Sequence, residues 1–128
     1  MSDKETVLYY GLRLVVEWYV GSNGHSQALE YYNELKIERR IGLLKLVKRL
    51  GDWGKIIDKT KFNYEGDQLF ALKANADRYL CFFAENSRVI ITNAFCKKSQ
   101  KLPKAEKQRA LRSKKEYYYR ITENAYHA

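Results

Sequence analysis

The segment between Leu69 and Phe95 constrains the fold most strongly, because short apolar runs alternate there with very short turns. The three runs, 69–73, 78–84 and 88–95, are rich in β-branched and aromatic residues, which favour strands. Connections of a few residues can join antiparallel neighbours but cannot form the long crossover that parallel strands need. The segment therefore predicts a meander of three antiparallel strands. Its turns are Asn75-Ala76-Asp77 and Glu85-Asn86-Ser87.

The residues before this meander predict one strand and two helices. Residues 8–20 mix β-branched and aromatic side chains, and the turn Gly21-Ser22-Asn23-Gly24 ends them. Ser26 is placed to cap a helix, and a second helix begins near Lys36, so we expect a helical hairpin. In the first helix, the apolar residues on one face are Ala28, Leu29, Tyr32 and Leu35. In the second, the apolar stripe consists of Ile37, Ile41, Leu44 and Val47, and Leu43, Leu46 and Leu50 make it wider. Gly51 stands where a C-terminal cap would end this helix.

The rest of the chain predicts a polar loop over 52–68 and a last helix that starts at Pro103 and ends near Tyr119. The 128 residues, 45% of them hydrophobic, suffice for a single domain over 1–128 with its own core. We therefore expect a compact α+β fold. In it, a small antiparallel β-sheet is covered on one face by the N-terminal helical pair and left partly open on the other, and a basic helix forms the C-terminal part.

Positive charge is concentrated near the C-terminus. The chain carries 24 Lys and Arg against 15 Asp and Glu, a formal net charge of +9. Residues 97–120 hold ten basic and two acidic residues, so this stretch nets +8 and the remainder +1. Such a stretch favours a polyanionic partner, RNA above all. A solvated helix face has the same composition, and the charges alone leave both interpretations open.

Other features exclude whole classes of protein. No apolar run approaches the roughly 18 residues that a transmembrane helix needs, and Met1–Thr6 lacks the basic and apolar segments of a secretory signal. Cys81 and Cys96 lie in apolar segments without CxxC spacing or a nearby histidine, which predicts reduced core thiols and no zinc site. We expect a cytoplasmic protein that does not bind a membrane.

Four basic residues are predicted to meet at one end of the sheet. Lys73 ends the first strand of the meander, Arg78 begins the second, and Lys97 and Lys98 follow the third. In an antiparallel meander these ends lie at the same edge. The cluster is a candidate phosphate site, although strand ends also carry charges for solvation alone.

Four sequence blocks carry a family resemblance. Residues 16–32 read as a strand, an Asn-Gly turn and a helix start; 69–73 as an apolar strand closed by a basic residue; and 77–83 as an arginine followed by apolar and aromatic residues. The most specific block is Phe95-Cys96-Lys97-Lys98-Ser99-Gln100-Lys101-Leu102-Pro103-Lys104-Ala105-Glu106. Together these blocks span about residues 12–117. The chain resembles the phage-derived, HigB-like branch of the HigB/RelE superfamily of type II toxins. In that branch the last block reads Phe-x-Lys-Lys-Thr-x-Lys-x-Pro-x-x-Glu.

The resemblance implies a RelE-like fold and the toxin of a type II toxin–antitoxin system. Such a toxin is an endoribonuclease (mRNA interferase) that cleaves mRNA on the ribosome and inhibits translation without a metal or other cofactor. The implied partners are a cognate antitoxin of the helix-turn-helix type, the ribosome and mRNA, with operator DNA bound only through the antitoxin complex. Carried over position by position, the resemblance assigns catalytic roles to Lys73, Arg78 and Lys98.

The chemistry of metal-independent cleavage fits these residue types. The 2′-hydroxyl of RNA attacks the adjacent phosphate, so the enzyme must help remove a proton, stabilise phosphoryl charge and protonate the leaving 5′-oxygen. An arginine fork matches two phosphate oxygens, which suits Arg78. Like charges nearby ease proton loss from a lysine, which suits Lys73 or Lys98. Further basic residues are expected to bind RNA phosphates without reading sequence: Lys97, Lys101, Lys104, Lys107 and Arg112.

The sequence also departs from the family pattern. Pro103 and Lys104 occupy the region where some members carry a catalytic tyrosine, and Tyr117–Tyr119 come too late to replace it. His127 is expected to lie in a mobile tail, and His25 in a polar turn without a catalytic role. A non-catalytic RNA-binding or regulatory module with the same fold therefore stays open as an alternative. A sequence-specific DNA-binding protein is less favoured, because residues 26–50 fit sheet-covering helices better than a helix-turn-helix.

Overall fold

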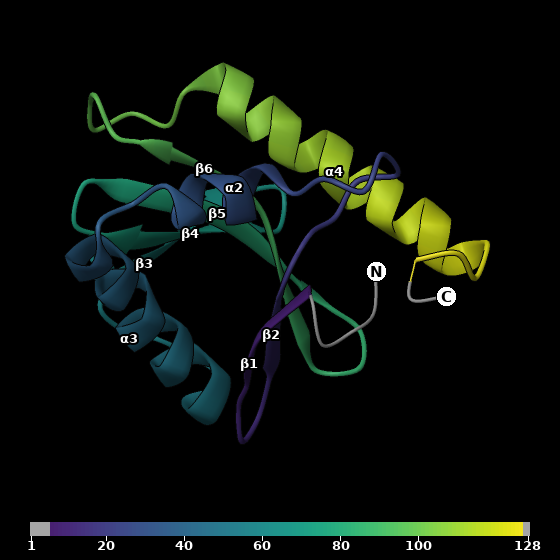
Figure 1. Cartoon of the computed structure of the whole chain (residues 1–128), viewed down its shortest axis with the longest axis horizontal. Coiled ribbons are helices and arrows are strands. Elements are labelled where there is room, and N and C mark those ends of the chain that lie inside the picture. The colour runs from purple at the N-terminus through teal and green to yellow at the C-terminus, as the bar shows by residue number, and fades with distance from the viewer. Residues whose placement is uncertain (1–5, 127–128) are drawn as a thin grey trace.

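A six-stranded sheet forms the centre of the computed structural model, which describes residues 6–126 (Figure 1). The strand order is β1-β2-β6-β5-β4-β3, and three helices accompany it in the described part of the chain. The elements, in chain order, are β1 (Val7–Tyr10), β2 (Val15–Trp18), α2 (Gln27–Asn33), α3 (Ile37–Trp53), β3 (Phe62–Gly66), β4 (Leu69–Ala74), β5 (Asp77–Ala84), β6 (Arg88–Cys96) and α4 (Lys104–Thr122).

The α+β class and the antiparallel meander β4-β5-β6 are confirmed, but the sheet is larger than predicted and is not wholly antiparallel. β2 pairs parallel to β6, with Val15 opposite Arg88 and Trp18 opposite Ile91. The intervening chain contains two helices and three strands and is long enough for such a crossover. Local sequence pattern carries no signal for a pairing between residues this far apart.

Two segments were assigned wrongly from the sequence. Residues 8–20 form two strands rather than one, because the chain turns at Gly11, where a Cβ would lie 2.2 Å from the carbonyl carbon of Gly51. Only glycine permits this approach of two backbones. The predicted loop 52–68 contains the edge strand β3, which pairs with β4 through Phe62 and Leu72.

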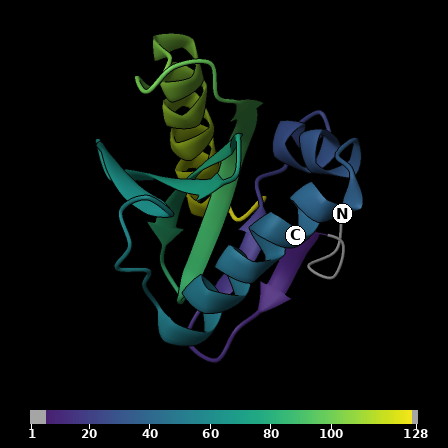
Figure 2. The same ribbon diagram turned by 90° about the vertical axis from the view of Figure 1, so that its left-hand side faces the viewer.

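Helices cover both faces of the sheet (Figure 2). On one face, α2 packs against β6, and α3 packs against β4 and the β1-β2 hairpin. The two helices thus contact different parts of the sheet instead of forming the expected helical pair. On the other face, expected to be partly open, α4 packs against β6 and β5 through Ala110 and Tyr117. Strand β6 lies between the two cores, and Val89–Ala94 are all buried.

Helix α3 buries only part of the apolar stripe that its spacing predicts. Leu43, Leu46, Val47 and Leu50 of that stripe are buried, whereas Ile37, Ile41 and Leu44 are exposed. The sequence pattern alone does not say which part of the stripe is buried. The observed orientation buries the leucine-rich part.

Helix α4 begins where predicted, directly after Pro103, and runs three residues further than expected. Among its tyrosines, Tyr117 is buried and packs edge-to-face on Phe82, and Tyr119 is exposed. Cys81 is buried, but Cys96 is exposed at the end of β6, so the prediction of a core thiol is wrong for Cys96. No helix in residues 6–126 is both long and apolar enough to cross a membrane.

The orientation of α3 can be tested with two neighbouring leucines. Leu43→Ala should lower the free energy of unfolding by about 3 kcal/mol, because it removes a fully buried side chain and leaves a cavity. Leu44→Ala should cost less than about 1 kcal/mol, because that side chain is exposed. Urea unfolding followed by circular dichroism measures both values. A cost for Leu44→Ala as large as that for Leu43→Ala would contradict this orientation of α3.

The cysteines should differ in reactivity. Burial raises the pKa of the Cys81 thiol to about 12, and the thiolate is the form that reacts. Iodoacetamide at neutral pH should therefore label Cys96 in the native protein and Cys81 only after unfolding, as read by peptide mass spectrometry. Labelling of native Cys81 at the rate of Cys96 would contradict its position in the core.

Candidate functional site

A basic pocket lies at one end of the sheet, on the face that carries α4. Lys73 of β4 is directly opposite Arg78 of β5, which in turn is opposite Phe95 of β6. Lys73 lies two positions after Ala71, and Arg78 two positions before Leu80, and this period of two keeps strand residues on one face. Ala71 and Leu80 belong to the core under α4, and Phe95 packs against that core. The strand register therefore brings a lysine and an arginine side by side beyond the end of that core.

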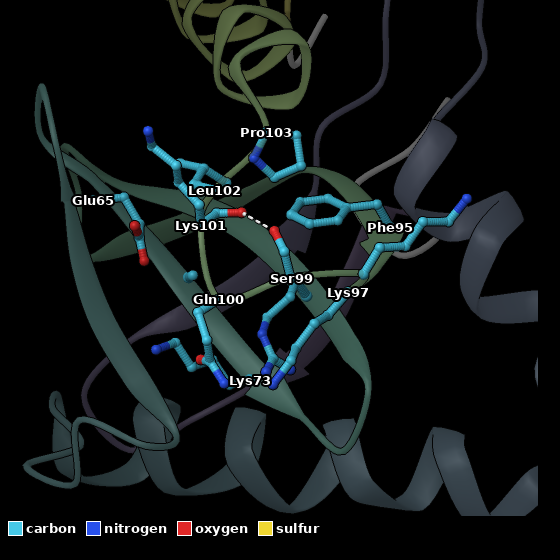
Figure 3. Close-up of a pocket in the computed structure, with 12 residues that line it drawn as sticks. Glu65, Lys73, Phe95, Lys97, Ser99, Gln100, Lys101, Leu102 and Pro103 are labelled. Atoms are coloured by element: carbon cyan, nitrogen blue, oxygen red, sulfur yellow. Dashed lines mark hydrogen bonds between the residues drawn. The ribbon is translucent and has the colours of Figure 1, made fainter.

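The loop from Lys97 to Pro103 closes the pocket on the side of α4 (Figure 3). The space between these residues is about 450 Å³, which includes solvent at the open mouth of the pocket. Figure 3 shows Glu65 on one side and Phe95 and Lys97 on the other. The lining residues are Glu65, Ala71, Lys73, Arg78, Phe95, Lys97, Lys98, Ser99, Gln100, Lys101, Leu102 and Pro103.

Five of the eight basic residues singled out from the sequence line this pocket: Lys73, Arg78, Lys97, Lys98 and Lys101. The other three do not. Lys104 is exposed on the first turn of α4, and Lys107 forms an ion pair with Asp67 at 3.0 Å. Arg112 lines a separate hollow between α4 and the turn around His25.

The guanidinium of Arg78 is held by the turn that precedes it. Its Nη1 donates hydrogen bonds to the carbonyl oxygens of Asn75, at 2.7 Å, and Asp77, at 3.0 Å. Asn75 adopts a left-handed conformation with φ of 57°, which asparagine tolerates better than most residues. The turn thus fixes one end of the fork, and an arginine has further N–H donors on its Nε and Nη2.

A buried carboxylate anchors this turn from the opposite face of the sheet. Asp77 is fully buried. Its Oδ1 accepts a hydrogen bond from Tyr31 Oη at 2.5 Å and also pairs with Arg39 Nη2, and its Oδ2 accepts from Arg39 Nε at 3.0 Å. Burial, and then the hydrogen bond to Asp77, raise the pKa of the Tyr31 hydroxyl above its ordinary value. The carboxylate therefore ties α2 and α3 to the first residue of β5, one position before Arg78.

The loop over the pocket is fastened at both ends. At its start, the Lys97 amide donates to the Ala76 carbonyl at 2.7 Å. At its end, Asn93 Nδ2 on β6 donates to Glu106 in the first turn of α4, at 2.9 Å to Oε1 and 3.1 Å to the carbonyl. Between these points, Ser99 Oγ donates to the Lys101 carbonyl at 3.3 Å.

Sequence reasoning missed Glu65, the one carboxylate among the described residues that line the pocket. It lies on β3, where Asn63 Nδ2 donates to its Oε2 at 3.2 Å. The alternation of Phe62 and Tyr64 with polar residues before Gly66 is a strand signal that could have placed it. Within residues 6–126, no three His, Cys, Asp or Glu side chains gather where they could hold a metal ion.

His25 lies away from the pocket. His25 Nδ1 contacts Glu30 at 3.1 Å on the exposed surface near α2, and His127 lies outside the described residues.

Comparison with known families adds an independent finding. The family model described as phage derived protein Gp49-like matches residues 30–115. The chain belongs to the phage-derived Gp49-like family. This family is part of the RelE/HigB-like toxin superfamily. The Gp49-like match includes every residue that lines the basic pocket. No curated protein matches the chain.

The Asp77 anchor predicts a large difference between two ion pairs of this Gp49-like protein. Asp77→Ala should lower the free energy of unfolding by about 3–5 kcal/mol, because it leaves Arg39 and Tyr31 without their acceptor. Glu30→Ala removes the partner of exposed His25 and should cost less than about 1 kcal/mol. Urea unfolding measures both. Similar costs would show that Asp77 does not anchor the turn.

Proposed function

We propose that this Gp49-like protein is the toxin of a toxin–antitoxin pair and acts as a metal-independent endoribonuclease on ribosome-bound mRNA. The observation that carries the proposal is the cross-strand pair of Lys73 and Arg78 in a pocket shared with Lys97, Lys98 and Lys101. Five basic residues and one carboxylate line this pocket, and such an excess of positive charge suits a phosphodiester. Membership of a family within the RelE/HigB-like superfamily supports the same substrate class.

The proposed reaction needs only the RNA and the protein. The 2′-oxygen forms a bond to the adjacent phosphorus, and the bond from phosphorus to the 5′-oxygen breaks. One proton leaves the 2′-hydroxyl and one is added to the 5′-oxygen, so the products are a 2′,3′-cyclic phosphate and a 5′-hydroxyl. The protein must move these two protons and stabilise the charge that builds up on the phosphoryl oxygens.

Arg78 is assigned to the phosphoryl oxygens. The hydrogen bonds from its Nη1 to Asn75 and Asp77 hold the guanidinium in place before the substrate arrives, and a donor that is already oriented costs no reorganisation during the reaction. Nε and Nη2 are the atoms that we assign to phosphate. Lysine in this position would supply charge without the planar fork.

Proton transfer is assigned to the groups around the pocket. Glu65 is a carboxylate on the side of the pocket away from Lys97 and is the acceptor that we assign to the 2′-hydroxyl proton (Figure 3). Lys73 or Lys98 then donates to the leaving 5′-oxygen. With these assignments, the two proton transfers need neither a histidine nor a tyrosine.

The basic helix and loop would hold the RNA. Lys97 and Lys101 lie at the pocket, and Lys104 and Arg112 continue the positive charge along α4. Lys107 is less available, because Asp67 partly neutralises it. Contacts of this kind bind phosphates irrespective of sequence, so the ribosome would supply the positioning of the scissile bond. The antitoxin would be the partner that controls the free protein.

The test is Arg78→Ala in a translating extract. We expect loss of cleavage by a factor of about 100 or more, because a preorganised donor to the transition state is removed. Mapping 5′-hydroxyl ends on translated messages measures the rate. Arg13→Ala, which removes one exposed charge from the turn between β1 and β2, is the matched control and should cleave at the parental rate.

Full cleavage by a correctly folded Arg78→Ala protein would remove Arg78 from the site. If the parental protein bound ribosomes but produced no new RNA ends, the result would instead favour the non-catalytic RNA-binding module.

A further inference from the structure

Helix α3 carries an apolar stripe that nothing in the described structure covers. Ile37, Ile41 and Leu44 are 61%, 43% and 38% exposed, on the side of the helix opposite to the buried Leu43, Leu46 and Leu50. In Figure 2, α3 (blue) lies in front of the sheet, and no coloured ribbon passes in front of it. Three exposed aliphatic side chains along one side of a helix lower the solubility of a protein. A helix needs only one apolar face to pack on its own sheet, so this second face is not required by the fold.

The spacing of this stripe is that of a helix–helix seam. Ile37, Ile41 and Leu44 follow one another at intervals of four and three residues, which is the a/d spacing of a coiled coil. The next position in this spacing is Lys48, which is ion-paired with Asp52. A stripe limited to these positions is narrower than the face by which a helix packs on a globular core. The stripe therefore fits a single helix laid along α3, with apolar contact over about two turns.

The charges beside the stripe favour an acidic partner. Over 36–53 there are six basic residues and two acidic residues, Glu38 and Asp52. Asp52 is engaged by Lys48 Nζ at 2.8 Å and Tyr9 Oη at 2.8 Å, and among the basic residues Arg39 is neutralised by Asp77. Lys36, Lys45 and Arg49 remain exposed. A second copy of this chain would set these cations against themselves, so self-association through the stripe is disfavoured.

We propose that the outer stripe of α3 is a docking surface for an amphipathic helix of the antitoxin, with aliphatic residues in the seam and acidic residues at its flanks. The identity of the partner rests on the proposed function; the chemistry of the surface does not. α3 and the α4-side pocket lie on opposite faces of the sheet, so variants of the stripe leave the residues of the proposed nuclease site in place.

The experiment uses the full chain and a synthetic helical peptide of about three heptads, with leucine in the seam and glutamate at the flanking positions. Fluorescence anisotropy should show binding by the parental protein. Ile41→Glu and Leu44→Glu should each weaken it about 10-fold or more, because each removes apolar burial and adds a repelled charge. Thermal unfolding should stay close to parental, since both side chains are exposed. The same peptide with lysine at its flanks should not bind.

Ile57→Glu is the matched control: it is an exposed isoleucine beside another apolar hollow, lined by Arg49, Trp53 and Ile56, and should leave peptide affinity unchanged. Loss of binding in this variant but not in the stripe variants would overturn the proposal. The proposal would also be overturned if the peptide did not bind up to about 1 mM, or if both peptides bound equally. A concentration-dependent dimer that Ile41→Glu disrupts would identify a second copy of this chain as the occupant instead. Flotation with anionic vesicles that the stripe variants abolish would identify a lipid surface instead. None of these outcomes depends on RNA cleavage, so failure here is distinguishable from failure of the nuclease assignment.

Discussion

The pairing of β2 alongside β6 is the constraint on which the rest of this structure depends. It makes β6 an interior strand with neighbours on both sides, and its residues alternate between a core under α2 and α3 and a core under α4. Ile91 belongs to the first core and Ile90 to the second. Strand β2 pairs with the first residues of β6, Arg88 to Ile91, and the far end of β6 stays in register with β5, where Phe95 is opposite Arg78. The position of the basic pocket follows from this register.

The two faces of the sheet contribute differently to the pocket. On the face of α2 and α3, a fully buried carboxylate is matched by an arginine and a tyrosine, so its charge is compensated where water cannot reach it. One residue further along β5, Arg78 points to the other face and lies among other cations. Two adjacent positions on β5 thus belong to different groups of charges. Asp77 is part of a buried ion pair, and Arg78 is part of a pocket with five basic residues and one carboxylate. The pleat of a strand makes this separation possible within two residues.

Much of this arrangement could be predicted from the sequence, and the failures have definite causes. The meander was predictable because its turns are short and its strands strongly apolar, and the positions of Lys73 and Arg78 followed from it. The parallel pairing of β2 was not predictable, since it joins segments about seventy positions apart. Glu65 was missed with β3, an edge strand whose side chains are half polar. The exposure of Ile37, Ile41 and Leu44 on α3 was missed because they form one continuous apolar pattern with the buried leucines, and only packing against the sheet separates the two groups.

The bond from Asn93 to the first turn of α4 has a mechanical consequence for the loop over the pocket. With Lys97 held to Ala76 at one end and Glu106 held to Asn93 at the other, the segment between them is a tether with two fixed ends. Its lysine side chains can change direction, but its backbone cannot lift from the pocket as a whole without breaking one of these attachments. Rearrangement of the positive charge over the pocket is therefore expected from rotation of side chains rather than from opening of the loop.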